Sequence, residues 1–216
     1  MQHTFDKKMA SKITARNTPE NIRFRMTVRF SLLYLALFTV GLLAQRLLPL
    51  TRLSVWRDFW EEALSSPLRG GIPARDEIRA MLFSVRREML LLVLLLFAGM
   101  TMLSERICGA VLSLHAFLFG TLCCSIADTY LSAPAFSAKA ALPICVLAQF
   151  ANAVILLTAA GEAVIFSYRY RDIGRGPRKM RDSLTVHYIL HALTMIGTMT
   201  AIGVIRALVL HALQNL

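Results

Sequence analysis

Long runs of apolar residues, separated by short polar segments, dominate the chain. Charged residues cluster at the ends of five such runs: Phe30–Gln45 (continuing past Arg46 to Leu50), Met89–Ser104, Ile107–Ala127, Ala140–Gly161 (continuing past Glu162 to Tyr168) and Ser183–Ile205. A helix needs about 20 mainly apolar residues to cross about 30 Å of hydrocarbon. The last three runs reach that length unaided, and the first two reach it with flanking residues. The pattern predicts an all-α integral membrane protein with five transmembrane helices.

These spans divide the chain into four expected parts. Residues 1–29 form a basic tail, 30–50 the first transmembrane helix, 51–85 an extracytoplasmic helical loop and 86–216 a four-helix membrane domain. The polar tail is too long for the n-region of a cleavable signal, so the first span is expected to remain as an anchor. The second and third spans are joined by the short turn Ser104-Glu105-Arg106, which predicts that they pack as antiparallel neighbours.

Composition supports this class and charge sets the expected orientation. The chain is 56% hydrophobic with a mean hydropathy of +0.56 and a net charge of +11. Lys and Arg gather before the first span and before the fifth, and short cytoplasmic loops collect such residues. The N-terminus is therefore expected in the cytoplasm, although the loop between Arg46 and Glu88 carries eight Arg and opposes this assignment. No basic stretch is joined to a base-reading fold, so no nucleic-acid partner is expected.

The outer loop reads as two short amphipathic helices around a break rich in Gly and Pro. In the first, Trp56, Phe59 and Trp60 recur on one helical face. Tryptophan is enriched where membrane meets water, so this helix could simply lie at the interface. Exposed aromatic residues also anchor protein interfaces, so the same three residues are candidates for docking an extracytoplasmic partner. The sequence leaves both interpretations open.

Polar residues inside the apolar runs are candidate functional positions, because hydrocarbon makes them costly. Counting helical rise from the cytoplasmic side indicates that four of them share one layer: His115, Glu162, His187 and His191. Such a layer could carry protons or an ion, or it could be a hydrogen-bonded network that fixes helix packing. Gln149 and Asn152 are expected to serve packing. Glu162 is taken as the only acidic residue deep in a span, and Arg206 is expected to reach outward to the outer surface.

No catalytic constellation emerges from the motifs. We find no nucleophile with a base at motif spacing, no phosphate-binding glycine loop and no metal-ligand spacing. All the cysteines fall inside predicted spans, where they are expected to be small packing residues: Cys108, Cys123, Cys124 and Cys145. The sequence predicts a protein that is not an enzyme and that uses no cofactor.

The layout and three short motifs resemble the stage II sporulation protein M family of spore-forming bacteria. His115-Ala116-Phe117-Leu118-Phe119-Gly120 resembles the polar–Gly–Phe–x–x–Gly stretch of that family, with Phe117 and Gly120 matching. His115 stands where Asn or Lys is usual, and Ala116 replaces a glycine. Leu142-Pro143 resembles the opening of the family's fourth span, and Thr158-Ala159-Ala160-Gly161 its cytoplasmic end. Gly120, Pro143 and Gly161 are accordingly candidates for helix packing.

The resemblance covers residues 20–213 in the order of their spans and loops. It implies a scaffold in the cell membrane. Members of that family recruit peptidoglycan hydrolases, stage II sporulation proteins P and D, to the septal membrane of the mother cell during engulfment. For this chain it implies the lipid bilayer and such hydrolases as partners, with a homo-oligomer possible. The alternative is a small transporter or channel component built around the Glu/His layer.

Overall fold

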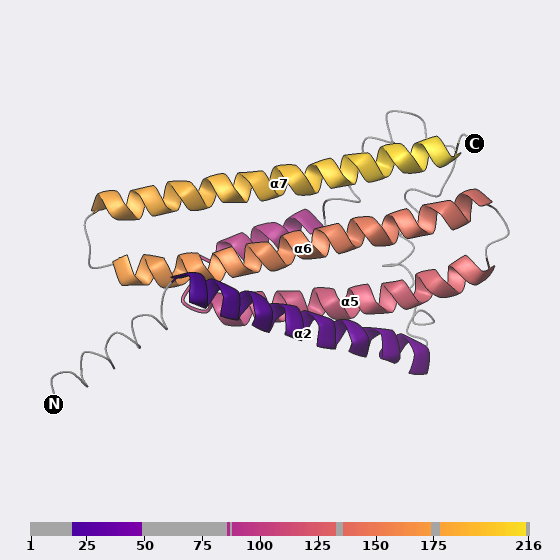
Figure 1. Cartoon of the computed structure of the whole chain (residues 1–216), viewed down its shortest axis with the longest axis horizontal. Coiled ribbons are helices and arrows are strands. Elements are labelled where there is room, and N and C mark those ends of the chain that lie inside the picture. Colours follow the sequence, from indigo (N-terminus) through magenta and orange to yellow (C-terminus); the bar gives the residue numbers. More distant parts are fainter. Residues whose placement is uncertain (1–18, 49–85, 87, 133–135, 174–177, 215–216) are drawn as a thin grey trace, which may run out of the picture.

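The computed structural model describes residues 19–48, 86, 88–132, 136–173 and 178–214. These residues form one short helix, Glu88–Ala98, and four long helices: α2 (Pro19–Leu47), α5 (Ser104–Ser132), α6 (Phe136–Ile173) and α7 (Arg178–Gln214) (Figure 1). No strand occurs in these ranges. The predicted all-α class is confirmed.

Four helices are long and apolar enough to cross a membrane, over Asn21–Leu47, Ser104–Cys124, Pro143–Asp172 and Asp182–Val209. They indicate a multi-pass membrane protein. The predicted second span is represented by the helix Glu88–Ala98, whose 11 residues reach only about 16 Å. A fifth span is therefore still a prediction. Many large apolar side chains face outward, as a lipid environment requires, including Leu32 and Leu43 on α2 and Leu190 and Leu193 on α7.

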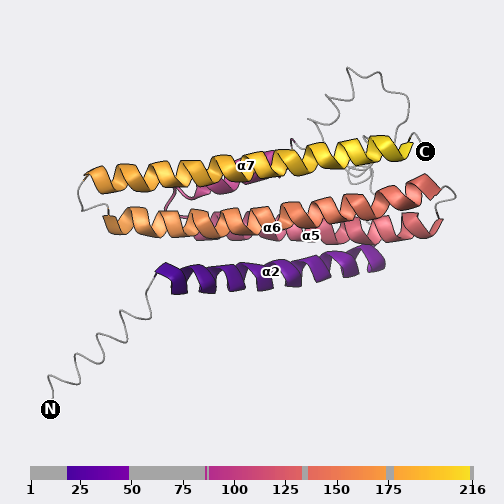
Figure 2. The same ribbon diagram turned by 45° about the horizontal axis from the view of Figure 1, so that its top comes forward.

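The helices alternate in direction. α2, α5 and α7 run one way, and α6 and the Glu88–Ala98 helix run the other way (Figures 1 and 2). The starts of α2, α5 and α7 therefore meet the end of α6 at one end of the bundle. We call this the basic end, because the sequence places Arg23, Arg25, Arg29, Arg169 and Arg171 there. An alternating bundle with one basic end agrees with the charge pattern of the sequence.

The turn between the second and third predicted spans lies earlier than expected. Residues 99–103 form it, with Gly99, Met100 and Thr101 each donating a backbone hydrogen bond three residues back. Ser104-Glu105-Arg106, predicted as the turn, instead begins α5. An acidic side chain such as Glu105 is favoured in the first turn of a helix, where the backbone N–H groups carry partial positive charge. The turn was predicted at these residues because Glu105 and Arg106 are charged, but charged residues are also common at the start of a helix.

The closest helix packing lies between α2 and α5. A side chain at Gly41 on α2 would collide with the backbone carbonyl of Phe117, and one at Gly120 on α5 would collide with the carbonyl of Phe38. Because glycine has no side chain, each of these positions lets the backbone of the other helix approach closely. In membranes, where apolar burial does not drive helix association, this close approach supplies the packing energy.

Aromatic side chains pack beside this crossing and between α6 and α7. The rings of Phe38, Phe119 and Phe150 meet where α2, α5 and α6 converge, with centroids 4.9 Å apart for Phe119 and Phe150. On the other side, Tyr188 of α7 stacks on Phe166 of α6 with centroids 4.1 Å apart. These two contacts hold the inner faces of the long helices together.

Candidate functional site

The only charged residue that the sequence placed deep in the fourth run forms an ion pair. The Glu162 carboxylate on α6 lies 2.5 Å from the Arg23 guanidinium on α2. The Glu162 side chain is 18% exposed and that of Arg23 is 59% exposed, so the pair is reached from the basic end. A Cβ atom added at Gly161, next to Glu162, would make an ordinary contact of 3.6 Å with Thr27 on α2. The carboxylate that the sequence left without a specific partner is therefore neutralised by the basic N-terminal segment.

A second ion pair joins the same end of the bundle. Arg29 on α2 pairs with Glu105 in the first turn of α5. The Tyr168 hydroxyl on α6 donates to the other Glu105 oxygen at 3.4 Å. Glu105 thus connects α2, α5 and α6, and together with the Arg23–Glu162 pair it fixes the start of α2 against both neighbours.

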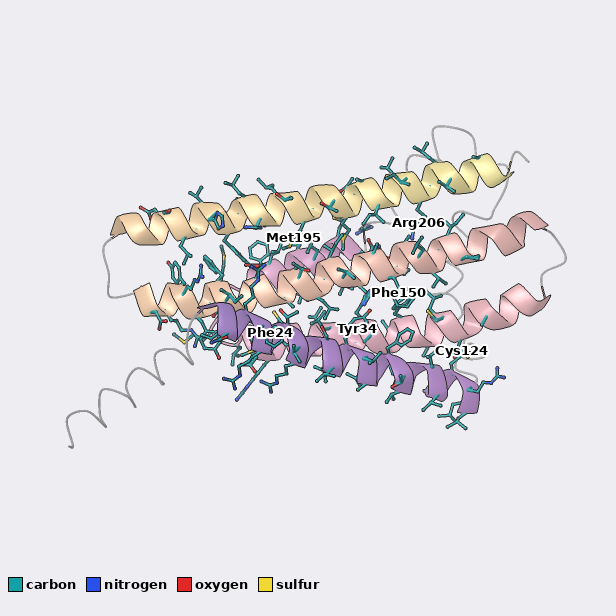
Figure 3. The ribbon with its side chains drawn as sticks, in the orientation of Figure 1. Phe24, Tyr34, Cys124, Phe150, Met195 and Arg206 are labelled. Carbon is teal, nitrogen blue, oxygen red and sulfur yellow. The ribbon has the colours of Figure 1, made fainter. Side chains whose placement is uncertain are left out.

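His115 lies inside the bundle in a different pair. Its Nδ1 and the Tyr34 hydroxyl lie 2.8 Å apart and share a buried hydrogen bond between α5 and α2. The imidazole also lies beside Phe119, with ring centroids 6.2 Å apart. Figure 3 shows Tyr34 on the side of α2 that faces the bundle. The pair lets two polar side chains lie in the apolar core because each satisfies the other.

The predicted single layer of His115, Glu162, His187 and His191 does not form as the depth count suggested. Arg23 and Tyr34, the partners of Glu162 and His115, are 11 residues apart on α2, which is about 16 Å along the helix. His187 and His191 are exposed on the outside of α7, where their rings meet edge to face at 4.7 Å. The count therefore misjudged the height of His115 relative to Glu162, and it gave no information on which face of α7 carries His187 and His191.

A buried carboxylate lies elsewhere, at the start of the short helix. Glu88 is 7% exposed, and its Oε1 accepts a 2.8 Å hydrogen bond from Gln149 Nε2 on α6. Its Oε2 accepts no hydrogen bond from the described residues. One turn along α6, Asn152 is 5% exposed, and its Oδ1 likewise accepts none from this part of the chain. The sequence analysis singled out Glu162 alone, whereas the bundle also buries the carboxylate of Glu88.

Arg206 also departs from its prediction. Its side chain is only 8% exposed, and it extends from α7 toward α6 rather than outward (Figure 3). The sequence placed Arg206 near the outer surface, where a long side chain can reach the headgroups. Because position 206 follows Tyr188 and Met199 on the inward face of α7, packing directs it into the bundle instead.

The remaining predicted positions fall into three groups. Gly120 and Gly161 lie at helix contacts, whereas Pro143 is an exposed residue within α6. Trp56, Phe59 and Trp60 lie outside the described residues. The cysteines are free thiols, and no group of three His, Cys, Asp or Glu in the described ranges could hold a metal ion.

Three partners were missed by the sequence analysis: Arg23, Tyr34 and Glu88. For the first two a signal was present, because Arg23, Phe30, Tyr34 and Gly41 recur at near-heptad spacing on one face of α2. For Glu88 the signal was the apolar stripe Ile78, Met81, Leu82 and Val85, which precedes it at helical spacing. Counting Glu88 as the end of a loop concealed it.

Comparison of the chain with protein-family models, curated proteins and solved structures found no match.

Proposed function

We propose that this protein is a non-enzymatic membrane scaffold with five spans and a cytoplasmic N-terminus. In this proposal the helix Glu88–Ala98 belongs to the second span, and the loop of residues 51–85 faces outward. The observation that carries the proposal is how the intramembrane polar groups are used. Arg23–Glu162, Tyr34–His115 and Gln149–Glu88 each join two different helices. Groups paired in this way fix the arrangement of helices, which a scaffold requires.

A rigid bundle suits a protein that positions others. The close Gly41–Gly120 packing and the two ion pairs at the basic end hold α2 to α5 and α6. A partner held on the outer side would then be placed by the bundle. The resemblance to stage II sporulation protein M suggests which partner: membrane-associated peptidoglycan hydrolases, stage II sporulation proteins P and D, at the septal membrane.

The outer aromatic residues provide the test. We expect Trp56→Ala with Trp60→Ala to reduce co-purification of such a hydrolase while the membrane level of the protein stays unchanged. Leu32→Ala with Leu43→Ala, on the lipid-facing side of α2, serves as the matched control. Equal recovery of the hydrolase with both double variants would mean that the tryptophans only anchor their helix at the interface. Failure of the parent itself to recover a hydrolase contradicts the scaffold.

A second candidate function, a small transporter or channel component, rests on Glu88 rather than on Glu162. Buried carboxylates in membranes mark ion and proton pathways, and the Glu88 Oε2 atom accepts no hydrogen bond from the described residues. Glu162 serves this role less well because Arg23 already neutralises it. Substitution of Glu88, argued in the Discussion, separates the two functions.

A further inference from the structure

Helix α2 lies at one edge of the bundle and carries an exposed row that is basic at its start and apolar beyond it (Figure 2). We call it the α2 row: Arg25, Arg29, Leu32, Ala36 and Leu43. Its members follow one another at intervals of four, three, four and seven residues, so their side chains leave one side of the helix. All five are exposed, Leu32 by 63% and Leu43 by 61%. The row therefore faces the surroundings of the protein.

The dimensions of the α2 row match one leaflet of a bilayer. The apolar run of the sequence begins at Phe30, so Arg25 and Arg29 lie at the level of the headgroups. From Leu32 to Leu43 the apolar part extends about 16 Å along the helix, and half of the hydrocarbon thickness is about 15 Å. The row thus has the length of one phospholipid, with a charged end for the headgroup and an apolar surface for an acyl chain.

The charged end of the row is suited to an anion. Among the described residues, no carboxylate pairs with Arg25 and no group accepts a hydrogen bond from its side chain. Arg29 pairs with Glu105, but its side chain remains 69% exposed, which leaves further N–H donors of the guanidinium accessible. One carboxylate beside two guanidinium groups leaves a net positive charge. Guanidinium matches phosphate in both charge and hydrogen-bonding geometry.

Two other exposed faces at the basic end lack this combination. On α7 the exposed apolar side chains of Val186 and Leu193 follow the exposed residue Asp182, whose carboxylate repels an anion. On α6, Arg169 is exposed, but Ile165 one turn away is buried, so no apolar surface continues from this arginine. On α2 an unpaired guanidinium and an exposed apolar surface lie in one row.

We propose that the α2 row is a binding site for an anionic phospholipid of the leaflet at the basic end. Arg25 and Arg29 bind its phosphate, and the apolar part of the row contacts one acyl chain. Selectivity follows from net charge: the headgroup of phosphatidylcholine carries an ammonium that offsets its phosphate, whereas phosphatidylglycerol keeps its negative charge. Arginine near an anionic membrane surface stabilises binding. The inference does not depend on the scaffold function or on the orientation of the chain, because it uses only the surface of α2.

Lipid binding to the purified protein in a neutral detergent tests the site. Phosphatidylglycerol and phosphatidylcholine with the same acyl chains are titrated, and native mass spectrometry counts the bound lipid. The parent should bind phosphatidylglycerol more tightly. Arg25→Gln should weaken this binding about fivefold, the contribution of one arginine near an anionic membrane surface. The fold should persist, because the described residues make no polar contact with the Arg25 side chain.

Arg169→Gln is the matched control, since it removes the same charge from the same end of the bundle. It should leave the affinity for phosphatidylglycerol unchanged. Equal weakening by both variants would mean that diffuse charge and not the α2 row attracts the lipid. That result overturns the proposal, as does a parent that binds both lipids equally or an Arg25→Gln variant that binds like the parent.

Competition separates a lipid site from a site for free phosphate. Inorganic phosphate should displace no more phosphatidylglycerol than chloride does at equal ionic strength, because phosphate lacks the acyl chain that contacts Leu32 and Leu43. Greater displacement by phosphate shows an anion site without an apolar part and overturns the proposal.

Photo-cross-linking in vesicles locates the bound lipid. A benzophenone amino acid in place of Ala36, in vesicles with equal amounts of the two lipids, should attach phosphatidylglycerol in excess. The same group in place of Leu193, on the α7 face that follows Asp182, should attach no such excess. The same lipid ratio at both positions overturns the proposal. So does capture of a second copy of the chain at position 36, which would mean that protein and not lipid covers the row.

Discussion

Arg23 and Glu162, 139 positions apart in the chain, hold their charged groups 2.5 Å from each other across the contact between α2 and α6. The pair gives the basic N-terminal segment a structural role besides setting topology. It also explains how an acidic residue within the candidate span Pro143–Asp172 avoids an uncompensated charge.

Charge-reversal variants test whether the Arg23–Glu162 pair contributes to the stability of the protein. Glu162→Arg alone and Arg23→Glu alone place like charges together and should each lower the thermal stability of the solubilised protein, by about 1 kcal/mol since Arg23 is well exposed. The double variant should recover most of that loss. Thermal unfolding followed by size-exclusion chromatography measures it. Arg25→Glu, which changes an exposed residue on the same helix, should not rescue Glu162→Arg; if it does, general charge and not the pair is responsible.

The contact of Gly41 and Gly120 predicts that the cost of a larger side chain on α5 depends strongly on its position. Gly120→Leu should force α5 away from the Phe38 carbonyl of α2 and cost about 1–3 kcal/mol or more, as overpacking does. The folded protein recovered from membranes measures the loss. Gly109→Leu is the matched control on α5, because a side chain there meets nothing within 4 Å. Equal recovery of both variants would show that the α2–α5 crossing does not depend on Gly120.

The sequence predicted the fold class because apolar length is a strong signal. Four of the five predicted spans match long apolar helices, and the fourth, predicted over Ala140–Gly161, lies within α6. The second is the exception, since only the helix Glu88–Ala98 is described there. Hydropathy measures how many apolar residues follow one another, and it says less about where two helices joined by a tight turn meet.

The polar site was predicted less well, for a physical reason. Helical rise counted from the ends of the predicted spans placed the four residues of the predicted layer at one height, although the partners of Glu162 and His115 lie about 16 Å apart along α2. Partners are also decided by rotation about the helix axis, which the count does not include. His115 turns inward to Tyr34, whereas His187 turns outward on α7. The neighbours of a helix set that rotation, and a single helix does not encode them.

The proposed orientation predicts which sites a membrane-impermeant thiol reagent reaches in intact cells. Gly70→Cys in the outer loop should be labelled, whereas Arg169→Cys at the basic end should be labelled only after the cells are opened. The parent chain supplies the background, since its own cysteines fall inside predicted spans. Labelling of Arg169→Cys in intact cells would place the basic end outside and reverse the topology.

Glu88 separates a scaffold from a transporter. Glu88→Gln keeps the shape of the side chain and an oxygen that accepts from Gln149 Nε2, but it removes the ability to ionise. If Glu88 serves packing, this variant should keep a stability close to that of the parent and retain partner recovery, because the shape and the hydrogen bond from Gln149 are kept. Glu88→Leu leaves the Gln149 amide without its partner and should cost about 1–3 kcal/mol. Leu92→Ala, one turn along, sets the scale of a pure packing loss of about 2–5 kcal/mol.

A transporter gives the opposite order of effects. A carboxyl group that binds a proton or a cation in each cycle has no substitute in an amide, so Glu88→Gln should abolish flux while the protein remains folded at its normal level. Proteoliposomes with a pH-sensitive dye inside measure that flux, and Glu162→Gln is the matched control because Arg23 already neutralises Glu162. If the parent shows flux, Glu88→Gln abolishes it and Glu162→Gln preserves it, then the protein is a transporter centred on Glu88 and not a scaffold. Absence of flux from the parent, with both variants retaining partner recovery, leaves Glu88 as a packing residue at the contact between its helix and α6.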